Sequence, residues 1–333
     1  MRPLFKSADQ SLFETVPHLS LGRFPTPVIR LSLPGYPAFW VKDDGRTGTP
    51  YGGNKVRKFE YLLAEARQRG KGTLIVGGDT ESHTVRACAK LGRGSGFRVE
   101  AVVYPHGRPT GSARALAELS ATGARVILAR SFLETLIVAR LRALLTGGML
   151  VPLGGSSPLS TVGYIRAAFE LHRQVLAHEL PAPDRIYVAF ASGGTTAGLL
   201  IGLALAGSTA QVVAVQTVES AIANGRNLRR LVRLTLRRIA RPDIGLDTVM
   251  SRLARIDGSC LGSGYRDVPG SALEAMRALS GTPLSVETVF TAKALAVMLN
   301  DLSRDPSGAA LFWNTHDQGG SAGADSAGAP KPG

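Results

Sequence analysis

Short apolar runs rich in β-branched residues alternate along the chain with longer segments in which apolar residues recur every three or four positions. The short runs predict strands at 39–42, 73–76, 99–104, 125–128, 185–190, 211–216 and 309–313. The longer segments predict helices at 112–122, 132–145, 163–177 and 195–205, and a further helix that begins near residue 55. This alternation favours an α/β fold in which helices cover largely parallel sheets.

Three glycine-rich loops, at 77–83, 154–157 and 191–198, lie between the predicted elements. In a parallel sheet, ligands bind at the carboxyl ends of the strands, where such loops lead into helix N-termini. The third loop is neither a dinucleotide fingerprint nor a nucleotide P-loop, but its small residues let backbone N–H groups and hydroxyl groups converge on an anion. The residues predicted to hold a phosphate are Ser192, Gly193, Gly194, Thr195 and Thr196. The alternative is a close-packed turn with no ligand.

One lysine, Lys55, stands where the turn 52–54 enters a predicted helix. The positive end of the helix dipole and any desolvation disfavour the ammonium there, so the pKa of the amine should fall and its nucleophilicity should rise. Such a lysine can form a Schiff base with an aldehyde. The alternative interpretation is an ordinary solvated basic face made of Lys55, Arg57 and Lys58.

The composition is ordinary for a globular protein, with 44% hydrophobic and 19% charged residues, and the 333 positions allow about two domains. The formal net charge is +14, with arginines concentrated at 226–241. These arginines predict a solvated helix face, because no aromatic residues are interleaved with them to stack on bases. We therefore expect neither nucleic acid nor a membrane as partner, although a basic helix that binds RNA or membrane is the open alternative.

Only two cysteines occur, Cys88 and Cys260, and their distance in sequence supports neither a disulfide framework nor a cysteine metal site. The first residues lack the apolar run of a signal peptide, and no stretch approaches the roughly 18 apolar residues of a membrane helix, so we expect a cytoplasmic protein. His83 and Glu81 have no third residue at ligand spacing, so no metal is predicted. Residues 319–333 are mostly Gly, Ala, Ser and Pro and predict a disordered tail.

A reactive lysine and a phosphate-binding loop on an α/β chain together indicate pyridoxal 5'-phosphate, whose aldehyde reacts with lysine and whose phosphate suits a helix N-terminus. Several segments then resemble the D-cysteine desulfhydrase and 1-aminocyclopropane-1-carboxylate deaminase family, within the tryptophan synthase β-subunit-like class of pyridoxal phosphate enzymes. These segments are 52–60, 152–158 with 163–164, 192–195 and 289–294. The resemblance extends from about residue 24 to residue 320.

The resemblance implies two open, mostly parallel twisted sheets flanked by helices. A small domain, 57–165, would pack on a large cofactor domain made of 1–56 and 166–318, and homodimers are common in the family. Lys55, beside the cofactor-contacting Asn54, would bind the cofactor and move the substrate's α-proton.

Thr291 matches the position that faces the pyridine nitrogen, where the deaminase branch has a glutamate and the desulfhydrase branch a threonine. A neutral hydroxyl cannot keep that nitrogen protonated as a carboxylate would. The weaker electron withdrawal suits β-elimination and argues against opening of a cyclopropane ring.

Some positions depart from the family pattern. The family's Gln-Ser-Asn-His segment corresponds to residues 80–83 here. Two alignment registers are open. Either Glu81 takes the place of the catalytic serine and Ser82 that of the asparagine, or Ser82 takes the place of the serine and His83 that of the asparagine. In one register a carboxylate enters the site of the substrate's carboxylate, where like charges repel. Phe290 replaces one of two active-site tyrosines and has no proton to give, whereas Tyr265 matches the other or is an exposed loop residue.

The leading expectation is therefore a pyridoxal phosphate-dependent lyase that acts on a small amino acid by α-proton abstraction and β-elimination, like D-cysteine desulfhydrase. The changed residues leave open β-replacement, racemisation or another biosynthetic step, and also a non-catalytic cofactor-binding protein. The residues expected to be catalytic are Lys55, Ser82 and Tyr265, and those expected to contact the substrate are Glu81, Ser82, His83 and Phe290.

Overall fold

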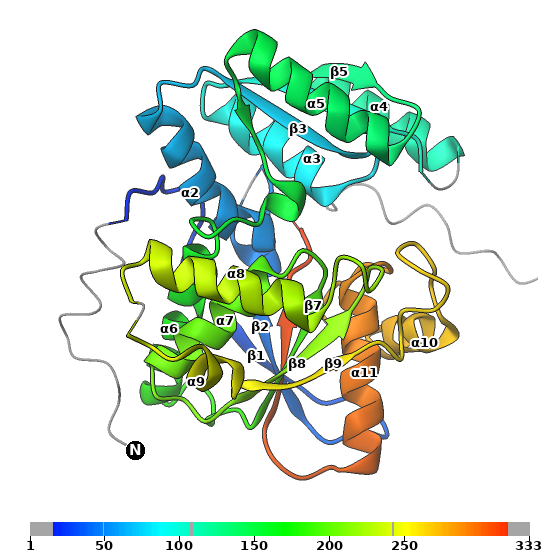
Figure 1. The fold of residues 1–333 in the computed structure, drawn as a ribbon. Coiled ribbons are helices and arrows are strands. Elements are labelled where there is room, and N and C mark those ends of the chain that lie inside the picture. Colours follow the sequence, from blue (N-terminus) through cyan, green and yellow to red (C-terminus); the bar gives the residue numbers. More distant parts are fainter. Residues whose placement is uncertain (1–15, 49, 107–108, 242, 319–333) are drawn as a thin grey trace, which may run out of the picture.

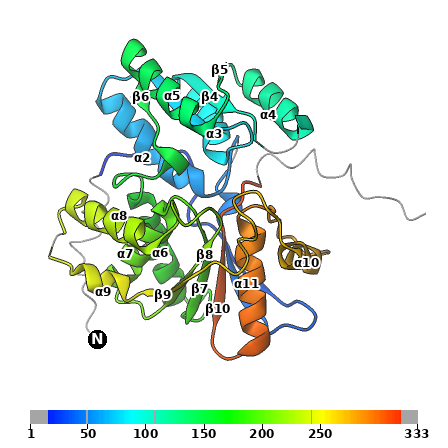
Figure 2. The same cartoon turned by 45° about the vertical axis from the view of Figure 1, so that its right-hand side comes forward.

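Two mostly parallel sheets, each covered by helices, make up the part of the chain that the computed structural model describes, namely residues 16–48, 50–106, 109–241 and 243–318. The larger sheet lies below the smaller one in Figure 1, and the view in Figure 2 shows that the helix α2 lies between them. The α/β class and the two-sheet architecture predicted from the sequence are confirmed.

The larger sheet has six strands in the order β1-β2-β10-β7-β8-β9. β1 is antiparallel to β2, and all other neighbours are parallel. The strands are β1 (Val28–Leu31), β2 (Phe39–Asp43), β7 (Arg185–Phe190), β8 (Gln211–Gln216), β9 (Leu253–Asp257) and β10 (Ala310–Asn314).

Helices cover both faces of this sheet, because alternate residues of its buried strands point to opposite sides. In β7, Ile186 and Val188 pack into one apolar cluster and Tyr187 into another. The first cluster joins the sheet to α6 (Val162–Leu176), α7 (Gly194–Leu205), α8 (Gly225–Arg238) and α9 (Leu246–Met250). The second joins it to α10 (Gly270–Ala278) and α11 (Thr291–Arg304).

The smaller sheet is parallel throughout, with the strand order β5-β4-β3-β6. Its strands are β3 (Thr73–Asp79), β4 (Arg98–Tyr104), β5 (Arg125–Leu128) and β6 (Met149–Leu150). One face packs on α2 (Asn54–Gln68), α3 (His83–Ala87) with the π-helical turn Cys88–Gly92, and α4 (Pro109–Ala121). The other face packs on α5 (Phe132–Thr146).

All seven predicted strands and all five predicted helices are present in the structure. The strands that the pattern missed are β1, β6 and β9, and each lies at the edge of a sheet. Edge strands are short and partly exposed, so they carry a weaker apolar signal than central ones. The arginines of α8 are exposed while Leu228, Val232 and Leu236 are buried, which confirms the solvated helix face.

The expected domain boundaries, after 56 and after 165, fall inside α2 and α6, the two helices that connect the sheets. The division into a large and a small domain stays a prediction, and the tail expected at 319–333 lies outside the described residues. Among the described residues, no helix is long and apolar enough to cross a membrane.

A cluster of four buried charges ties α2 to the larger sheet and to α6. Arg57 donates to Asp44 Oδ1 at 2.9 Å and to Glu170 Oε1 at 2.9 Å, and Lys42 Nζ lies 2.6 Å from the same Glu170 oxygen. Asp44 Oδ2 also accepts from Tyr164 and from Trp313. Burial acts to raise the pKa of Glu170, but the two cations outweigh it and lower that pKa to about 2.

Removing one charge from this cluster should destabilise the whole protein. Glu170→Gln leaves Arg57 and Lys42 with one carboxylate between them, and we expect a loss of about 3 kcal/mol in the free energy of unfolding, measured by urea denaturation. Because the pKa of Glu170 is lower in the folded state, its stabilisation is present above about pH 4.3 and is lost as the pH falls toward 2. Glu65→Gln, which breaks the partly exposed pair with Arg69, should cost less than about 1 kcal/mol. Equal losses in the two variants would contradict the prediction.

The outer face of α5 carries an apolar stripe. Leu133, Ile137, Leu141 and Leu144 recur at three- and four-residue steps, and their side chains are 50% to 81% exposed. Contiguous exposed apolar surface of this kind marks interaction sites. The stripe offers a surface for the homodimer that the family resemblance leads us to expect.

Charges placed on this stripe should weaken a homodimer that uses it. We expect the wild-type protein to sediment as a dimer and the double variant Ile137→Glu, Leu141→Glu to sediment as a monomer in analytical ultracentrifugation, because two carboxylates cannot be buried unpaired. Arg173→Glu, at an exposed position of α6, is the control. A monomeric wild type, or a double variant that remains dimeric, would overturn this prediction.

Candidate active site

A cavity of about 360 Å³ lies between the two sheets. Its walls come from segments that follow the carboxyl ends of β3, β7, β8 and β10, which is where parallel sheets bind ligands. The N-termini of α2, α7 and α11 also open onto it. The predicted site residues that line it are Asn54, Lys55, Ser82, His83, Ser192, Gly193, Thr195, Thr196, Tyr265, Phe290 and Thr291.

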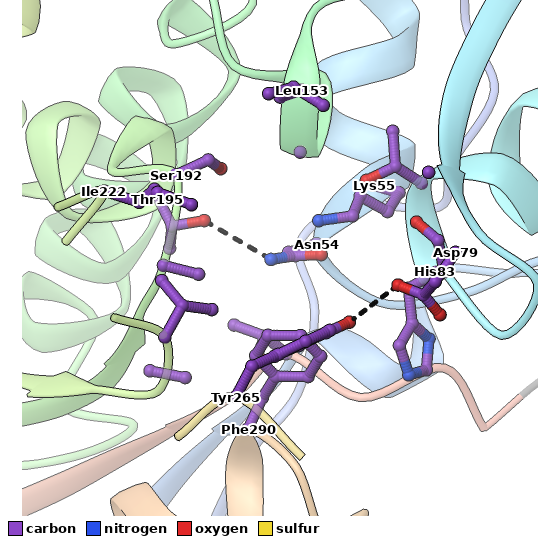
Figure 3. A pocket seen from close by; sticks show the side chains of 18 of the residues that line it. Asn54, Lys55, Asp79, His83, Leu153, Ser192, Thr195, Ile222, Tyr265 and Phe290 are labelled. Carbon is purple, nitrogen blue, oxygen red and sulfur yellow. Dashed lines mark hydrogen bonds between the residues drawn. The ribbon is translucent and has the colours of Figure 1, made fainter. Parts of the chain in front are cut away.

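Lys55 occupies the first turn of α2 and reaches into this cavity (Figure 3). The preceding Gly53 has φ +74°, and a Cβ there would lie 2.5 Å from the carbonyl oxygen of Thr315, so only glycine fits. The Lys55 side chain is half-buried. Burial lowers the pKa of its ammonium to about 8, although Glu287 acts to raise it. The lysine is therefore available as a neutral nucleophile near neutral pH.

Two of the glycine-rich loops meet to form an anion-binding cup at the N-terminus of α7. Ser156 Oγ lies 2.8 Å from Ser192 Oγ and accepts from the backbone N–H of Gly194 at 3.2 Å. Asn54 Nδ2 donates to Thr195 Oγ1 at 3.4 Å, and the buried hydroxyl of Thr196 has no hydrogen-bond partner among the described residues. Hydroxyls, free helix N–H groups and an unpaired buried donor together fit a phosphate.

Lys58 adds a buried amine to this cup. Its side chain is 2% exposed, and its Nζ lies 3.0 Å from Ser156 Oγ and 3.4 Å from the carbonyl oxygen of Gly154. Burial and the neighbouring Lys55 charge lower the pKa of Lys58 well below its usual value, and no carboxylate of the described residues pairs with it. A bound phosphate would supply the missing counter-charge. Because Arg57 and Lys58 are buried, the solvated basic face considered from the sequence does not form.

The loop after β3 places its residues in two different spaces. Ser82 and His83 line the main cavity, whereas Glu81 lines an adjoining cleft. His83 Nδ1 is 3.2 Å from the Tyr51 hydroxyl, and burial together with the Arg86 charge lowers the pKa of the imidazole well below its usual value, so the ring is neutral. No carboxylate from Glu81 points into the main cavity.

Tyr265 reaches the cavity from the loop before α10. Its hydroxyl donates to Asp79 Oδ2 at 3.3 Å, and burial raises the pKa of the phenol, so it stays protonated. Lys293 Nζ donates to the carbonyl oxygens of Leu261 and Gly264 and so holds this loop in place. Tyr265 is thus a cavity residue rather than an exposed loop tyrosine. The centres of the Tyr265 and Phe290 rings lie 5.7 Å apart.

Thr291 is buried at the N-terminus of α11 and is engaged by Glu287. Its hydroxyl accepts from the Glu287 N–H at 2.9 Å and lies 3.2 Å from the Glu287 carboxylate. That carboxylate also accepts from the N–H groups of Val289, Phe290 and Thr291, and so it binds the turn that leads into α11.

Sequence reasoning gave no role to Lys58, Ser156, Asp79 or Glu287. Glu287 is an acidic residue just before α11, but the sequence pattern did not predict that helix, so its role could not be inferred. For the others the contacts arise only when distant loops meet.

No group of three His, Cys, Asp or Glu side chains is arranged to hold a metal ion in the described parts of the chain. The donor set instead suits a phosphorylated aldehyde, with Lys55 for the aldehyde and the cup with Lys58 for the phosphate. The fold and this site together define a pyridoxal phosphate enzyme of the tryptophan synthase β-like type.

Comparison with known proteins agrees. Residues 19–314 match the family described as "Pyridoxal-phosphate dependent enzyme", and the chain belongs to that family. It is 31% identical to nocardicin C-9' epimerase of Nocardia uniformis subsp. tsuyamanensis, over 83% of this chain and 85% of the relative. It is 29% identical to D-cysteine desulfhydrase of Salmonella paratyphi A, over 90% of this chain and 93% of the relative.

The fold is shared with a solved homologue of 1-aminocyclopropane-1-carboxylate deaminase, at a TM-score of 0.79 and 23% identity, covering 95% of this chain and 96% of the other. The resemblance to the desulfhydrase and deaminase group and the prediction of pyridoxal phosphate as cofactor are confirmed.

Lys58 should contribute to the affinity for pyridoxal phosphate only through a contact with the phosphate group. Lys58→Gln removes a charge-assisted hydrogen bond, so the Kd for pyridoxal phosphate should rise about tenfold to a hundredfold, measured by absorbance titration of the apo-protein. The Kd for pyridoxal, which has no phosphate, should be unchanged. Lys71→Gln is the control, because Lys71 follows the C-terminal end of α2 and does not line the cavity. Equal weakening for both ligands would contradict a phosphate contact.

Proposed function

We propose that this protein is a lyase that acts on a small amino acid, with Lys55 moving the α-proton and a β-substituent then leaving, as in D-cysteine desulfhydrase. The observation that carries the proposal is the half-buried Lys55, whose pKa is lowered to about 8, facing a cavity that ends in an anion-binding cup. Bound pyridoxal phosphate supplies the electron sink that makes the α-proton acidic. The desulfhydrase relative supports the choice of a small amino acid.

The other residues of the cavity orient the substrate and control its protons. Ser82, at the N-terminal end of α3, is placed to donate to the substrate's carboxylate, and the neutral His83 ring adds no charge there. Tyr265, held protonated, donates to Asp79 and is the cavity phenol that would donate a proton to a leaving group. The neutral Thr291 hydroxyl suits elimination, because it does not hold a facing pyridine nitrogen in its protonated form.

Epimerisation at the α-carbon is a second candidate, favoured by two features of the chain. Phe290 cannot supply a proton to a leaving group, and His83 lines the cavity as an uncharged ring, so an α-proton can leave and return without loss of a substituent. The nocardicin C-9' epimerase relative carries out a reaction of this type by its name. β-Replacement shares the first step with both candidates.

Exchange of the α-proton in D₂O tests the proposal whichever reaction follows. The cofactor-loaded wild type should exchange the α-proton of D- or L-cysteine or of serine, followed by NMR, and Lys55→Ala should reduce the rate at least about a thousandfold, since it removes the proton carrier. Circular dichroism must show that the variant is folded. Pyruvate, ammonia and sulfide from a cysteine enantiomer would establish elimination.

Inversion of the α-carbon without an oxoacid product would instead favour the epimerase candidate. If no amino acid undergoes exchange although pyridoxal phosphate is attached to Lys55, the enzyme proposal fails and the non-catalytic alternative gains.

A further inference from the structure

A second space adjoins the main cavity on the side away from the phosphate cup. This cleft also measures about 360 Å³, and none of the cup residues lines it. Part of its wall belongs to the small domain, through α3 and α4, and part to the loop before α10 and the N-terminus of α11. The residues that line both the cavity and the cleft are His83, Tyr265, Glu287 and Phe290. These shared residues form a thin wall between the two spaces.

One ion pair connects the two sides of that wall. Asp79 lines the main cavity and not the cleft, whereas Arg266 lines the cleft and not the main cavity. Arg266 pairs with Asp79 through one guanidinium nitrogen and with Glu81 Oε2 through another at 2.5 Å. Asp79 and Glu81 belong to the smaller sheet's β3 and its following loop, and Arg266 to a loop of the larger one. The wall is therefore completed only when the two parts meet.

Neighbouring contacts hold the guanidinium in this place. It lies 5.2 Å from the centre of the Tyr265 ring, whose hydroxyl donates to the same Asp79 carboxylate. On the cleft side Glu81 packs against Gly111 of α4, where a Cβ would come within 2.4 Å of Oε1. The Arg266 side chain is 19% exposed and that of Asp79 is 6% exposed, so solvent screens their attraction only partly.

Because of its position relative to Lys55, this wall limits the length of the substrate's side chain. In Figure 3, Asp79 and His83 lie across Lys55 from Ser192 and Thr195 of the cup. With the phosphate in the cup and the aldehyde at Lys55, the space left for a substrate side chain ends at Asp79 and Tyr265. The cavity is at the low end of the roughly 300–1,000 Å³ of small-molecule sites, and it must hold both cofactor and substrate.

We propose that Arg266 is a specificity-determining residue, which closes the main cavity against the adjoining cleft and so restricts the enzyme to amino acids with short side chains. This inference rests on the proposed action on a free amino acid, but not on which reaction follows proton removal. Without Arg266 the two spaces join, and a longer unbranched side chain enters the cleft.

The test compares substrates of increasing length within each variant of the cofactor-loaded protein. Rates of α-proton exchange in D₂O are measured for both enantiomers of alanine, 2-aminobutyrate, norvaline and norleucine. For the wild type, kcat/KM should fall at least about tenfold from 2-aminobutyrate to norleucine, and for Arg266→Ala the same ratio should be below about threefold. A general loss of rate from looser domain contact does not affect this ratio.

Arg114→Ala is the matched control, because Arg114 lines the same cleft but pairs with Glu118 on α4 and takes no part in the wall. It should keep the wild-type length preference. Glu81→Gln, which removes only the cleft-side half of the double ion pair, should also keep most of it.

Equilibrium binding gives a second readout that does not depend on turnover. The α-methyl derivatives of alanine and norleucine have no α-proton, and their Kd values are measured by calorimetry. The wild type should bind the shorter one at least about tenfold more tightly, and Arg266→Ala should bind both within about threefold. The inference is overturned if Arg266→Ala keeps the wild-type length preference, if the wild type has none, or if Arg114→Ala loses it equally.

If only the proposed lyase reaction fails, the results differ from those that overturn the specificity inference. In that case exchange or binding still depends on side-chain length, but no oxoacid is formed. If the wild type neither exchanges any of these amino acids nor binds the α-methyl derivatives, both the inference and the proposed function fail.

Discussion

The buried charge cluster around Asp44 and Arg57 is the constraint on which the rest of the site depends. Arg57 stands between Lys55 and Lys58 on α2, and its ion pairs with Asp44 and Glu170 set the direction in which this helix leaves the larger sheet. Because Cβ atoms one and two positions apart have a fixed angular relation on a helix, anchoring Arg57 also directs Lys58 and Lys55. Lys55 and Lys58 therefore reach the cavity from one rigid element.

The electrostatics of the cavity follow from how its carboxylates are engaged. Glu287 accepts from the N–H groups of Val289 and of Thr291, the first residue of α11, and Asp79 is paired with Arg266, so neither carboxylate forms an ion pair with Lys55 or Lys58. Burial lowers the pKa of both lysines, because no ion pair with a carboxylate of the described residues offsets the loss of solvation. The site is thus short of negative charge where a phosphate binds and holds an amine ready for an aldehyde, which is the pattern expected of a preformed cofactor site.

The same loops that depart from the family pattern build the wall at the far end of the cavity. Glu81, which the sequence placed either in the catalytic position or beside it, turns away from the cavity and pairs with Arg266. His83 lines the cavity as a neutral ring. These changes alter the shape and the proton donors of the substrate end and leave the cofactor end intact, so the cofactor was easier to recognise than the reaction.

The sequence by itself determined the α/β class, the central strands, the reactive Lys55 and the loop 192–196, because each of these depends on local periodicity or on residues adjacent in the chain. The sequence pattern did not predict the edge strands β1, β6 and β9, because short exposed strands carry little apolar signal. Only the tertiary structure brought Ser156 next to Ser192, placed Lys58 beside Ser156 and joined Arg266 to Asp79. These contacts link residues up to 187 positions apart, and no local pattern encodes which distant loops will meet at the carboxyl edge of two sheets.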